Sequence, residues 1–256
     1  MIVGEARTAP ILLRVDDLQV AYGKAEVVHG VSFDVRAGEF VVMLGRNGAG
    51  KSTTLHALSG LIPKRAGSVW FEGNDIAHSS AREIVRTGIV QVLQGHRVFA
   101  DLSVEDNLLI GTVARFPRGD KAALEGIYAL FPELATRRTE PASRLSGGQQ
   151  QILAVAQGII GKPRLLILDE PSAGLAPIVI DRILSVAGDL CAQGLAILLV
   201  EQLVEKALMR AHYCYLMETG RIAAQGTSDE IHRSNVLQHI YLGGADRALP
   251  GQQAKP

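Results

Sequence analysis

Residues 45–53 read GRNGAGKST and match the pattern G-x-x-x-x-G-K-[ST], a loop that cradles phosphate. The apolar run FVVML, residues 40–44, precedes the loop, and a helical pattern over about 51–61 follows it. A strand, a glycine-rich turn and a helix N-terminus together bind phosphate, because backbone N–H groups and the helix dipole converge on the anion. This segment therefore favours an α/β fold and indicates nucleotide binding.

The residue types in this loop have distinct expected roles. Its glycines allow positive φ angles and a close approach of backbone N–H groups to phosphate oxygens. Lys51 is expected to reach the β- and γ-phosphates, and the Ser52 hydroxyl is expected to ligate Mg²⁺. The loop residues predicted to bind the nucleotide are Gly45, Arg46, Asn47, Gly48, Ala49, Gly50, Lys51, Ser52 and Thr53.

A second apolar run, LLILDEP at residues 165–171, contains two adjacent carboxylates. In parallel α/β sheets the ligand crevice lies at the carboxyl ends of the strands, so both side chains are expected beside the phosphate loop. Asp169 is predicted to hold Mg²⁺ through its water shell, and Glu170 is placed to polarise an attacking water. The run ILLVEQ, residues 197–202, also ends in polar side chains and is expected at the same edge.

Composition argues against several other classes of protein. The 256 residues carry 26 basic and 26 acidic side chains, so nothing favours a general attraction to nucleic acid or anionic lipid. No segment approaches the roughly 18 consecutive apolar residues of a membrane span, and residues 1–10 lack the apolar stretch of a secretory signal. Cys191 and Cys214 lie in no C-x-x-C pair and the histidines lack metal-ligand spacing, so neither a disulfide nor a structural metal is expected.

Hydrophobic patterning predicts the order of the elements. Alternating or continuous apolar runs indicate strands, and capped periodic stretches indicate helices. The predicted strands are residues 12–22, 31–35, 40–44, 70–73, 164–168, 196–200, 213–217 and 221–225, the last two as a hairpin. The predicted helices are residues 51–61, a segment that begins at Ser103, residues 122–130, residues 146–160, and a final helix over residues 228–242 that Ser228 caps.

Residues 145–151, LSGGQQQ, narrow the class of nucleotide-binding protein, because they lie just before the LLILDEP strand. With the phosphate loop, the segments resemble the ATP-binding-cassette (ABC) ATPases. The resemblance implies an α/β P-loop NTPase fold: an ABC-type nucleotide-binding domain with a RecA-like mixed sheet core, an antiparallel β subdomain and an inserted helical subdomain. The implied boundaries are one domain over residues 11–243, the helical subdomain at about 96–161, and flexible tails at 1–10 and 244–256.

The resemblance also implies roles for residues outside the phosphate loop. Tyr22 is similar to the aromatic residue that stacks on adenine. Gln94 is similar to the glutamine that contacts Mg²⁺ and the attacking water, although Leu93 replaces the usual proline before it. The LSGGQ turn is expected to face the γ-phosphate held by an opposite subunit, because a serine, glycine amides and a helix N-terminus form an anion site. The residues implied there are Ser146, Gly147, Gly148 and Gln149.

Two positions depart from the family pattern. Gln202 stands where most ABC ATPases have a histidine that contacts the γ-phosphate; its amide can donate a hydrogen bond but cannot become a cation. Ala176 stands where the family usually has aspartate. The catalytic residues implied by the resemblance are Glu170 as general base, Gln202, Gln94 and Lys51, and the implied Mg²⁺ ligands are Ser52, Gln94 and Asp169.

Both departures, together with the phrases LGRNGAGKSTTL, VFADLSVEDNL, EPSAGLAP and LLVEQ, resemble one ATPase subunit of the branched-chain amino-acid importers and their relatives for amides and urea. The implied function is hydrolysis of ATP, with Mg²⁺, coupled to uptake of branched-chain or related amino acids, at the cytoplasmic face of the inner membrane. The implied partners are two membrane permease subunits, a second nonidentical ATPase subunit and, indirectly, an external solute-binding protein. A homodimer is possible for the isolated chain.

Other functions stay open at this point. One is uptake of amides or urea, and another is export of lipid or polysaccharide. A third is an ABC ATPase acting on nucleic acid, but the chain has a single cassette and no basic run, so no nucleic-acid partner is expected. A fourth is a nucleotide-sensing interaction module, which would tolerate the loss of Glu170.

Overall fold

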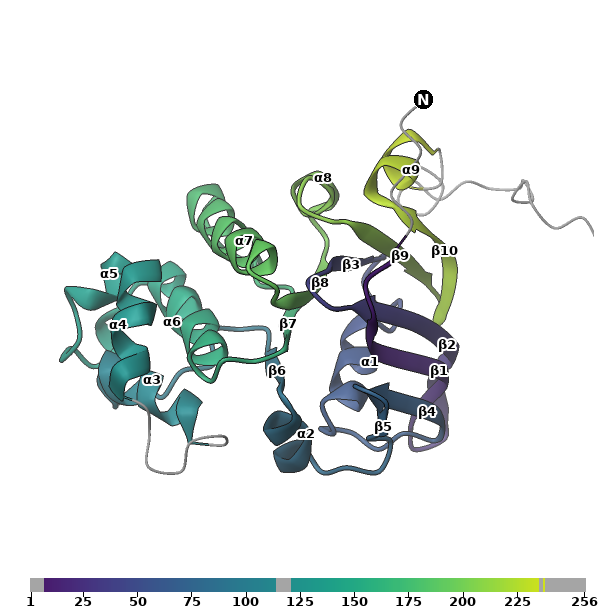
Figure 1. Cartoon of the computed structure of the whole chain (residues 1–256), viewed down its shortest axis with the longest axis horizontal. Coiled ribbons are helices and arrows are strands. Elements are labelled where there is room, and N and C mark those ends of the chain that lie inside the picture. The colour runs from purple at the N-terminus through teal and green to yellow at the C-terminus, as the bar shows by residue number, and fades with distance from the viewer. Residues whose placement is uncertain (1–6, 114–120, 235–236, 238–256) are drawn as a thin grey trace, which may run out of the picture.

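The computed structural model describes residues 7–113, 121–234 and 237. Two sheets stand side by side, and a group of helices extends from one end of the larger sheet (Figure 1). The larger sheet has six strands in the order β10-β9-β3-β8-β7-β6. Its strands are β3 (Phe40–Leu44), β6 (Ile89–Val92), β7 (Leu165–Asp169), β8 (Ala196–Glu201), β9 (Tyr213–Glu218) and β10 (Arg221–Thr227).

The centre of this sheet is parallel and fully buried. Strands β3, β7 and β8 are buried at every position, which explains why their sequences are continuous apolar runs. Strand β3 pairs in parallel with β8 and β9, β7 pairs in parallel with β6 and β8, and only β10 runs antiparallel. The carboxyl ends of β3, β7 and β8 therefore lie at one edge, where the phosphate loop, Asp169 and Glu201 emerge.

The second sheet is antiparallel, with the order β2-β1-β4-β5. Its strands are β1 (Ile11–Tyr22), β2 (Ala25–Arg36), β4 (Ala66–Phe71) and β5 (Asn74–Asp75). Helix α1 (Lys51–Leu58) packs between the two sheets, since Leu55 and Leu58 share a buried cluster with apolar residues of β1 and β3. This packing holds the N-terminus of α1 at the carboxyl edge of β3.

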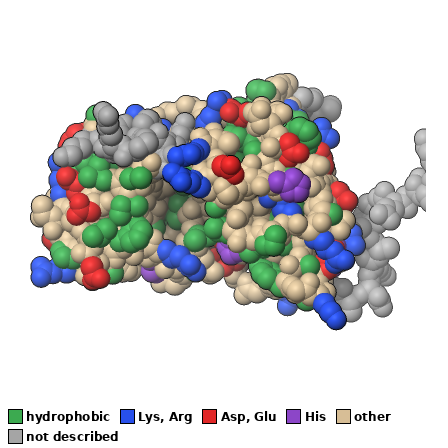
Figure 2. Space-filling view, turned by 90° about the horizontal axis from the view of Figure 1, so that it is seen from below, with side chains coloured by type: hydrophobic (Ala, Val, Ile, Leu, Met, Phe, Trp, Pro, Cys, Tyr) green, Lys and Arg blue, Asp and Glu red, His purple; other side chains and the backbone are tan. Residues whose placement is uncertain are grey.

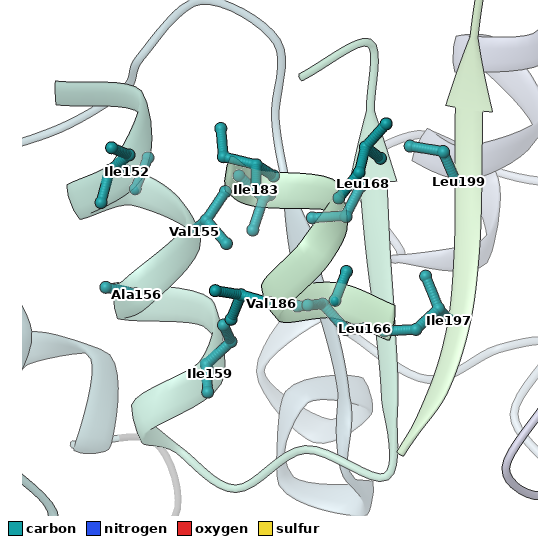
Figure 3. Close-up of a cluster of buried hydrophobic side chains, with 14 of the residues drawn as sticks. Ile152, Val155, Ala156, Ile159, Leu166, Leu168, Ile183, Val186, Ile197 and Leu199 are labelled. Carbon is teal, nitrogen blue, oxygen red and sulfur yellow. The ribbon is translucent and has the colours of Figure 1, made fainter. Parts of the chain in front are cut away.

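The helical end of the molecule lies between β6 and β7 in the chain (Figure 1). It comprises α3 (Val104–Thr112), α4 (Lys121–Leu130), α5 (Pro132–Ala135), a 3₁₀ turn (Ala142–Arg144) and α6 (Gly147–Ile160). Figure 3 shows Val155 and Ile159 of α6 facing Ile183 and Val186 of α7 (Pro177–Ala192), which in turn covers Leu166 and its neighbours on the sheet. Helix α6 therefore packs against α7, and at Gly158 it also lies directly on Val92 of β6 and Leu166 of β7.

Three further helices complete the described chain: α2 (Ala81–Thr87), α8 (Val204–Leu208) and α9 (Ser228–Arg233). The α/β fold, with a mixed sheet and a separate antiparallel sheet, confirms the predicted fold class. None of the helices in the described part of the chain is long and apolar enough to span a bilayer. The predicted domain boundaries stay predictions.

Two helix boundaries differ from the sequence prediction. Helix α1 ends at Leu58, because the chain turns at Ser59 and Gly60 takes a positive φ of 68°. The last helix is capped by Thr227 and not by Ser228: the Thr227 side chain accepts from the Glu230 backbone N–H, and the Glu230 carboxylate returns to the Thr227 N–H. Most of the predicted 228–242 helix beyond residue 234 lies outside the described residues.

The N-terminal segment is anchored at Arg7. Its guanidinium forms a bidentate pair with Glu39 at 2.7 and 2.8 Å, bonds Asp34 at 2.8 Å and stacks 3.9 Å from the centroid of the Tyr213 ring. A paired, stacked arginine of this kind holds a chain end far better than a solvated one. Residues 1–6 and 244–256 of the predicted tails lie outside the described residues.

Candidate active site

The phosphate loop joins β3 to α1 through a tight glycine-dependent turn. Gly48 and Gly50 take positive φ angles of 81° and 100°. A Cβ on Gly45 would lie 2.2 Å from the Met217 carbonyl oxygen, so a side chain there would displace backbone. Lys51 is 4% exposed, and its ammonium donates to the carbonyl oxygens of Gly45 and Arg46 at 2.9 and 3.2 Å. The Lys51 ammonium therefore links two backbone carbonyl groups at the start of the loop.

Two oxygen-bearing side chains meet beside the loop. The Ser52 hydroxyl donates to Asp169 Oδ1 at 2.9 Å, and His56 Nε2 lies 3.6 Å from Asp169 Oδ2. Burial raises the pKa of Asp169, and the Ser52 hydrogen bond and the nearby His56 partly oppose that rise. Mg²⁺ prefers oxygen donors and keeps several of its waters, so the Ser52 hydroxyl and, through a water, the Asp169 carboxylate fit a magnesium site.

Glu170 is the meeting point of the predicted catalytic side chains. It follows β7 in a left-handed conformation with φ of 44°. Gln94 Nε2 and Gln202 Nε2 both donate to Glu170 Oε2, at 3.1 and 3.0 Å, and Lys51 Nζ lies 3.5 Å from Oε1. Three segments, following β6, β7 and β8, thus converge on one carboxylate. The structure brings together all four predicted catalytic residues.

An open cavity of about 390 Å³ surrounds this convergence. That size is within the range of small-molecule sites, and its walls are mainly polar. Its lining residues are Val27, Asn47, Gly48, Gly50, Lys51, Ser52, Thr53, Gln94, Glu170 and Gln202. Val27 comes from β2 and was missed by the sequence prediction, since an apolar strand residue carries no chemical signal.

Some predicted nucleotide contacts do not line this cavity. Tyr22 lies at the end of β1 and is 51% exposed, so its predicted contact with adenine stays a prediction. Gly45 and Arg46 face Lys51 through their carbonyl oxygens, and the Ala49 carbonyl accepts from the Gly220 N–H at 2.9 Å. These three residues therefore hold the shape of the loop, and none of them lines the cavity.

The LSGGQ turn lies apart from this cavity in the single chain. Ser146 caps α6: its hydroxyl accepts from the Gln149 N–H at 3.3 Å, and the Gln149 side-chain oxygen accepts from the Ser146 N–H at 3.0 Å. Gly147 and Gly148 form the first turn of the helix. None of the four residues lines the cavity around Lys51, so one chain does not bring the two anion sites together.

His96 connects the loop after β6 to the same helix. It has a left-handed φ of 49°, and its Nδ1 lies 2.8 Å from the Gln151 side-chain oxygen. Gln151 is buried, and its Nε2 has no hydrogen-bond partner in the described part of the chain. The segment that carries Gln94 is therefore fastened to α6 near the LSGGQ turn.

The ABC transporter family model matches residues 28–173, which include the phosphate loop, LSGGQ and Glu170. The chain belongs to the ABC transporter family of ATPases. ATPase subunits of this family bind nucleotide and work together with membrane permease components. The predicted family and enzyme class are thus confirmed.

Relatives of this ABC ATPase include transport proteins of more than one kind. The branched-chain amino acid transport ATP-binding protein BraG of Pseudomonas aeruginosa is 38% identical over 91% of the chain and 100% of its own length. LivF of Archaeoglobus fulgidus, a probable branched-chain amino acid transport ATP-binding protein, is 34% identical over 92% and 100%. The lipopolysaccharide export protein LptB of Escherichia coli is 31% identical over 90% and 97%.

Solved structures share the fold of this ABC ATPase. The ADP conformation of MJ1267, an ATP-binding cassette of an ABC transporter, superposes with a TM-score of 0.81 at 28% identity, covering 92% of this chain and 100% of that one. A dimeric post-hydrolysis state of the cassette MJ0796, bound to ADP and Pi, has a TM-score of 0.77 at 19% identity and covers 85% and 99%. The second likeness shows the fold alone.

Helix α7 begins after Ala176, a residue whose side chain cannot cap a helix. This residue is the N-cap of α7 and makes no side-chain capping bond, although its backbone is extended as a cap requires. We expect Ala176→Asp to raise the free energy of unfolding by about 1 kcal/mol, because aspartate accepts a first-turn N–H and its charge favours the helix dipole. Urea unfolding measures this, with Ala176→Asn as the neutral-cap control. Equal stability in all three proteins would contradict it.

Proposed function

We propose that this ABC ATPase hydrolyses Mg-ATP to drive uptake of branched-chain or related amino acids. The observation that carries the enzymatic part is the convergence of Gln94, Gln202 and Lys51 on Glu170 at the rim of a phosphate-loop cavity. Support for the cargo comes from the transport proteins BraG and LivF, which match nearly the whole chain. We place the subunit peripherally at the cytoplasmic face of the inner membrane, bound to two permease subunits and served indirectly by a solute-binding protein.

In the proposed reaction, the phosphate loop and Lys51 bind the β- and γ-phosphates. Ser52, Asp169 and Gln94 would hold Mg²⁺, which would neutralise charge on the phosphate oxygens. Glu170 accepts a proton from the attacking water. The Gln94 and Gln202 amides, now on Glu170 Oε2, must turn toward the water and the γ-phosphate when nucleotide enters. In the structure, Gln94 and Gln202 donate hydrogen bonds to one oxygen of the proposed base, and Lys51 lies near the other.

The separation of Ser146 from Lys51 supports a two-subunit site. In the proposed assembly, the LSGGQ turn of one cassette covers the γ-phosphate held by the other. A second, nonidentical ATPase subunit could supply the histidine and the aspartate that Gln202 and Ala176 replace here. Full-rate hydrolysis by ATP-bound dimers of this chain alone would refute the need for that second subunit.

A groove beside Gln94 supports the proposed permease contact. It encloses about 290 Å³, is mainly apolar, and lies between α2, β6, α3 and α6. Its rim includes the exposed side chains of Phe99 and Ile110, and both polar atoms of the Gln91 amide are buried without a partner among the described residues. Hydrophobic side chains also gather over this helical end in Figure 2. A short cytoplasmic helix of a permease would cover this apolar rim.

Ile110→Lys should weaken this contact. Because a lysine buried against an apolar helix loses its hydration, we expect at least about tenfold less permease to co-purify with the variant. Val113→Lys is the matched control, since Val113 is equally apolar, 50% exposed and outside the groove lining. Co-purification of labelled permease from detergent measures the difference. Equal recovery with both variants would place the permease elsewhere.

The export function of the LptB relative is the main alternative, favoured by its 31% identity over 90% of the chain. Three assays compare cells with and without the gene. They measure the uptake of labelled leucine, the uptake of labelled urea, and the delivery of lipopolysaccharide to the cell surface. Loss of leucine uptake alone supports the proposal. Loss of urea uptake or of lipopolysaccharide delivery, with leucine uptake intact, would replace it.

A further inference from the structure

Glu201 is a buried carboxylate with no assigned role. It ends β8, and only 2% of its surface is exposed. Ser172 donates to it twice, from its backbone N–H to Oε1 at 3.0 Å and from its hydroxyl to Oε2 at 2.6 Å. The Gln202 backbone N–H donates to Oε2 at 3.0 Å. The Leu203 backbone also contributes a hydrogen bond, and all of these donors are neutral, so among the described residues the carboxylate is held by hydrogen bonds and not by a cation.

The cost of this arrangement suggests that it does more than end a strand. A carboxylate taken out of water is strongly disfavoured unless its oxygens are fully hydrogen-bonded, and burial raises the pKa of Glu201. A neutral residue could end β8 without that cost. We therefore expect the Glu201 carboxylate to act through the residues that its hydrogen-bond partners, Ser172 and Gln202, hold in place.

Those partners are neighbours of the reacting groups. Ser172 follows Glu170 by two residues, and Gln202 follows Glu201 directly. The Glu170 N–H also donates to the Val200 carbonyl at 2.9 Å, so the two strand ends are joined at two points. Across this junction Gln202 Nε2 reaches Glu170 Oε2 at 3.0 Å.

We propose that Glu201 is a positioning residue for ATP hydrolysis. Its carboxylate ties the loop after β7 to the loop after β8, and so fixes Gln202 relative to Glu170. Through Ser172 it also fixes the start of the 172–176 loop that leads into α7. The inference goes beyond the proposed transport function, and it rests on the proposed role of Glu170 as the base.

Steady-state kinetics separate positioning from mere stabilisation. Glu201→Gln keeps the shape but turns an NH₂ group toward backbone or hydroxyl donors, so the junction loosens. We expect kcat for Mg-ATP to fall at least about tenfold, with KM and the Kd of a fluorescent ATP analogue within about twofold of wild type. Ser172→Ala should lower kcat in the same direction but less. The double variant should have the same kcat as Glu201→Gln alone, since the two substitutions disrupt the same Glu201–Ser172 junction.

Glu205→Gln is the matched control, because Glu205 is an exposed carboxylate on α8 outside the site. The assays use whichever preparation hydrolyses Mg-ATP, the chain alone or with its partner subunits. A wild-type kcat in Glu201→Gln, or equal losses in kcat and nucleotide affinity, would overturn the inference. If Glu201→Gln does not fold, Ser172→Ala decides: an unchanged kcat in that folded variant overturns it. Glu170→Gln runs alongside, and activity in that variant would instead overturn the proposed base.

Discussion

Glu170→Gln is expected to lower kcat for ATP hydrolysis by at least about 100-fold while nucleotide still binds. General-base catalysis contributes about 10²–10⁴ in rate, and an uncharged amide cannot accept the water proton. The substitution keeps the size of the side chain. In the wild type, the side-chain nitrogens of Gln94 and Gln202 lie within 3.1 Å of Glu170 Oε2. The folded site should therefore persist, so ATP affinity should change little.

Phosphate release at saturating Mg-ATP measures this change, and an equilibrium titration with a fluorescent ATP analogue measures affinity. Glu205→Gln on the surface of α8 controls for loss of a carboxylate. A Glu170→Gln protein that keeps more than a tenth of the wild-type kcat would show that another group activates the water. A protein that loses ATP binding as well would show that Glu170 mainly maintains the loop.

Lys51→Ala is expected to have the largest effect on nucleotide affinity, weakening ATP binding by at least about 100-fold. The Lys51 ammonium is the one cation among the cavity-lining residues of the described chain, and charge-assisted bonds to phosphate are the strong ones. Its removal also takes away the two hydrogen bonds that the ammonium donates to the Gly45 and Arg46 carbonyl oxygens. The loss should therefore combine a missing charge with a less ordered loop.

Titration with ATP and with ADP tests this prediction. Because Lys51 is expected at the β- and γ-phosphates, the affinity for ATP should fall further than that for ADP. Lys206→Ala, a lysine on α8 outside the cavity, is the control. Unchanged ATP affinity in Lys51→Ala would mean that backbone N–H groups alone bind the phosphates.

The local parts of this site were predictable from the sequence. An apolar strand, a glycine-rich turn and a helix lie consecutively in the chain, so the phosphate loop needs only short-range geometry. The pair of carboxylates that follows an apolar strand is equally local. The capping box at Thr227 also has a sequence signal, since Glu230 follows three residues later and no such acid follows Ser228 at that spacing. The predicted Ser228 cap was therefore wrong.

The long-range parts could not be predicted from the separate patterns, and Gln94 and Gln202 were assigned to the site only through the family resemblance. Gln94 and Gln202 meet on Glu170 because β6, β7 and β8 are neighbours in the sheet, an order that the separate patterns do not specify. Val27 reaches the cavity because β2 passes the phosphate loop, where a Cβ on Gly50 would lie 3.1 Å from the Val27 carbonyl oxygen. The Glu201 junction and the Arg7 pairing likewise join segments distant in sequence.

The most direct test of the account is ATP-driven leucine uptake by membrane vesicles that hold the assembled transporter. Mg-ATP is placed on the cytoplasmic side, and labelled leucine with its solute-binding protein on the other. The account predicts uptake with the wild-type chain and uptake near background with Glu170→Gln. Leucine uptake that persists with Glu170→Gln, or hydrolysis that never moves leucine, would contradict it.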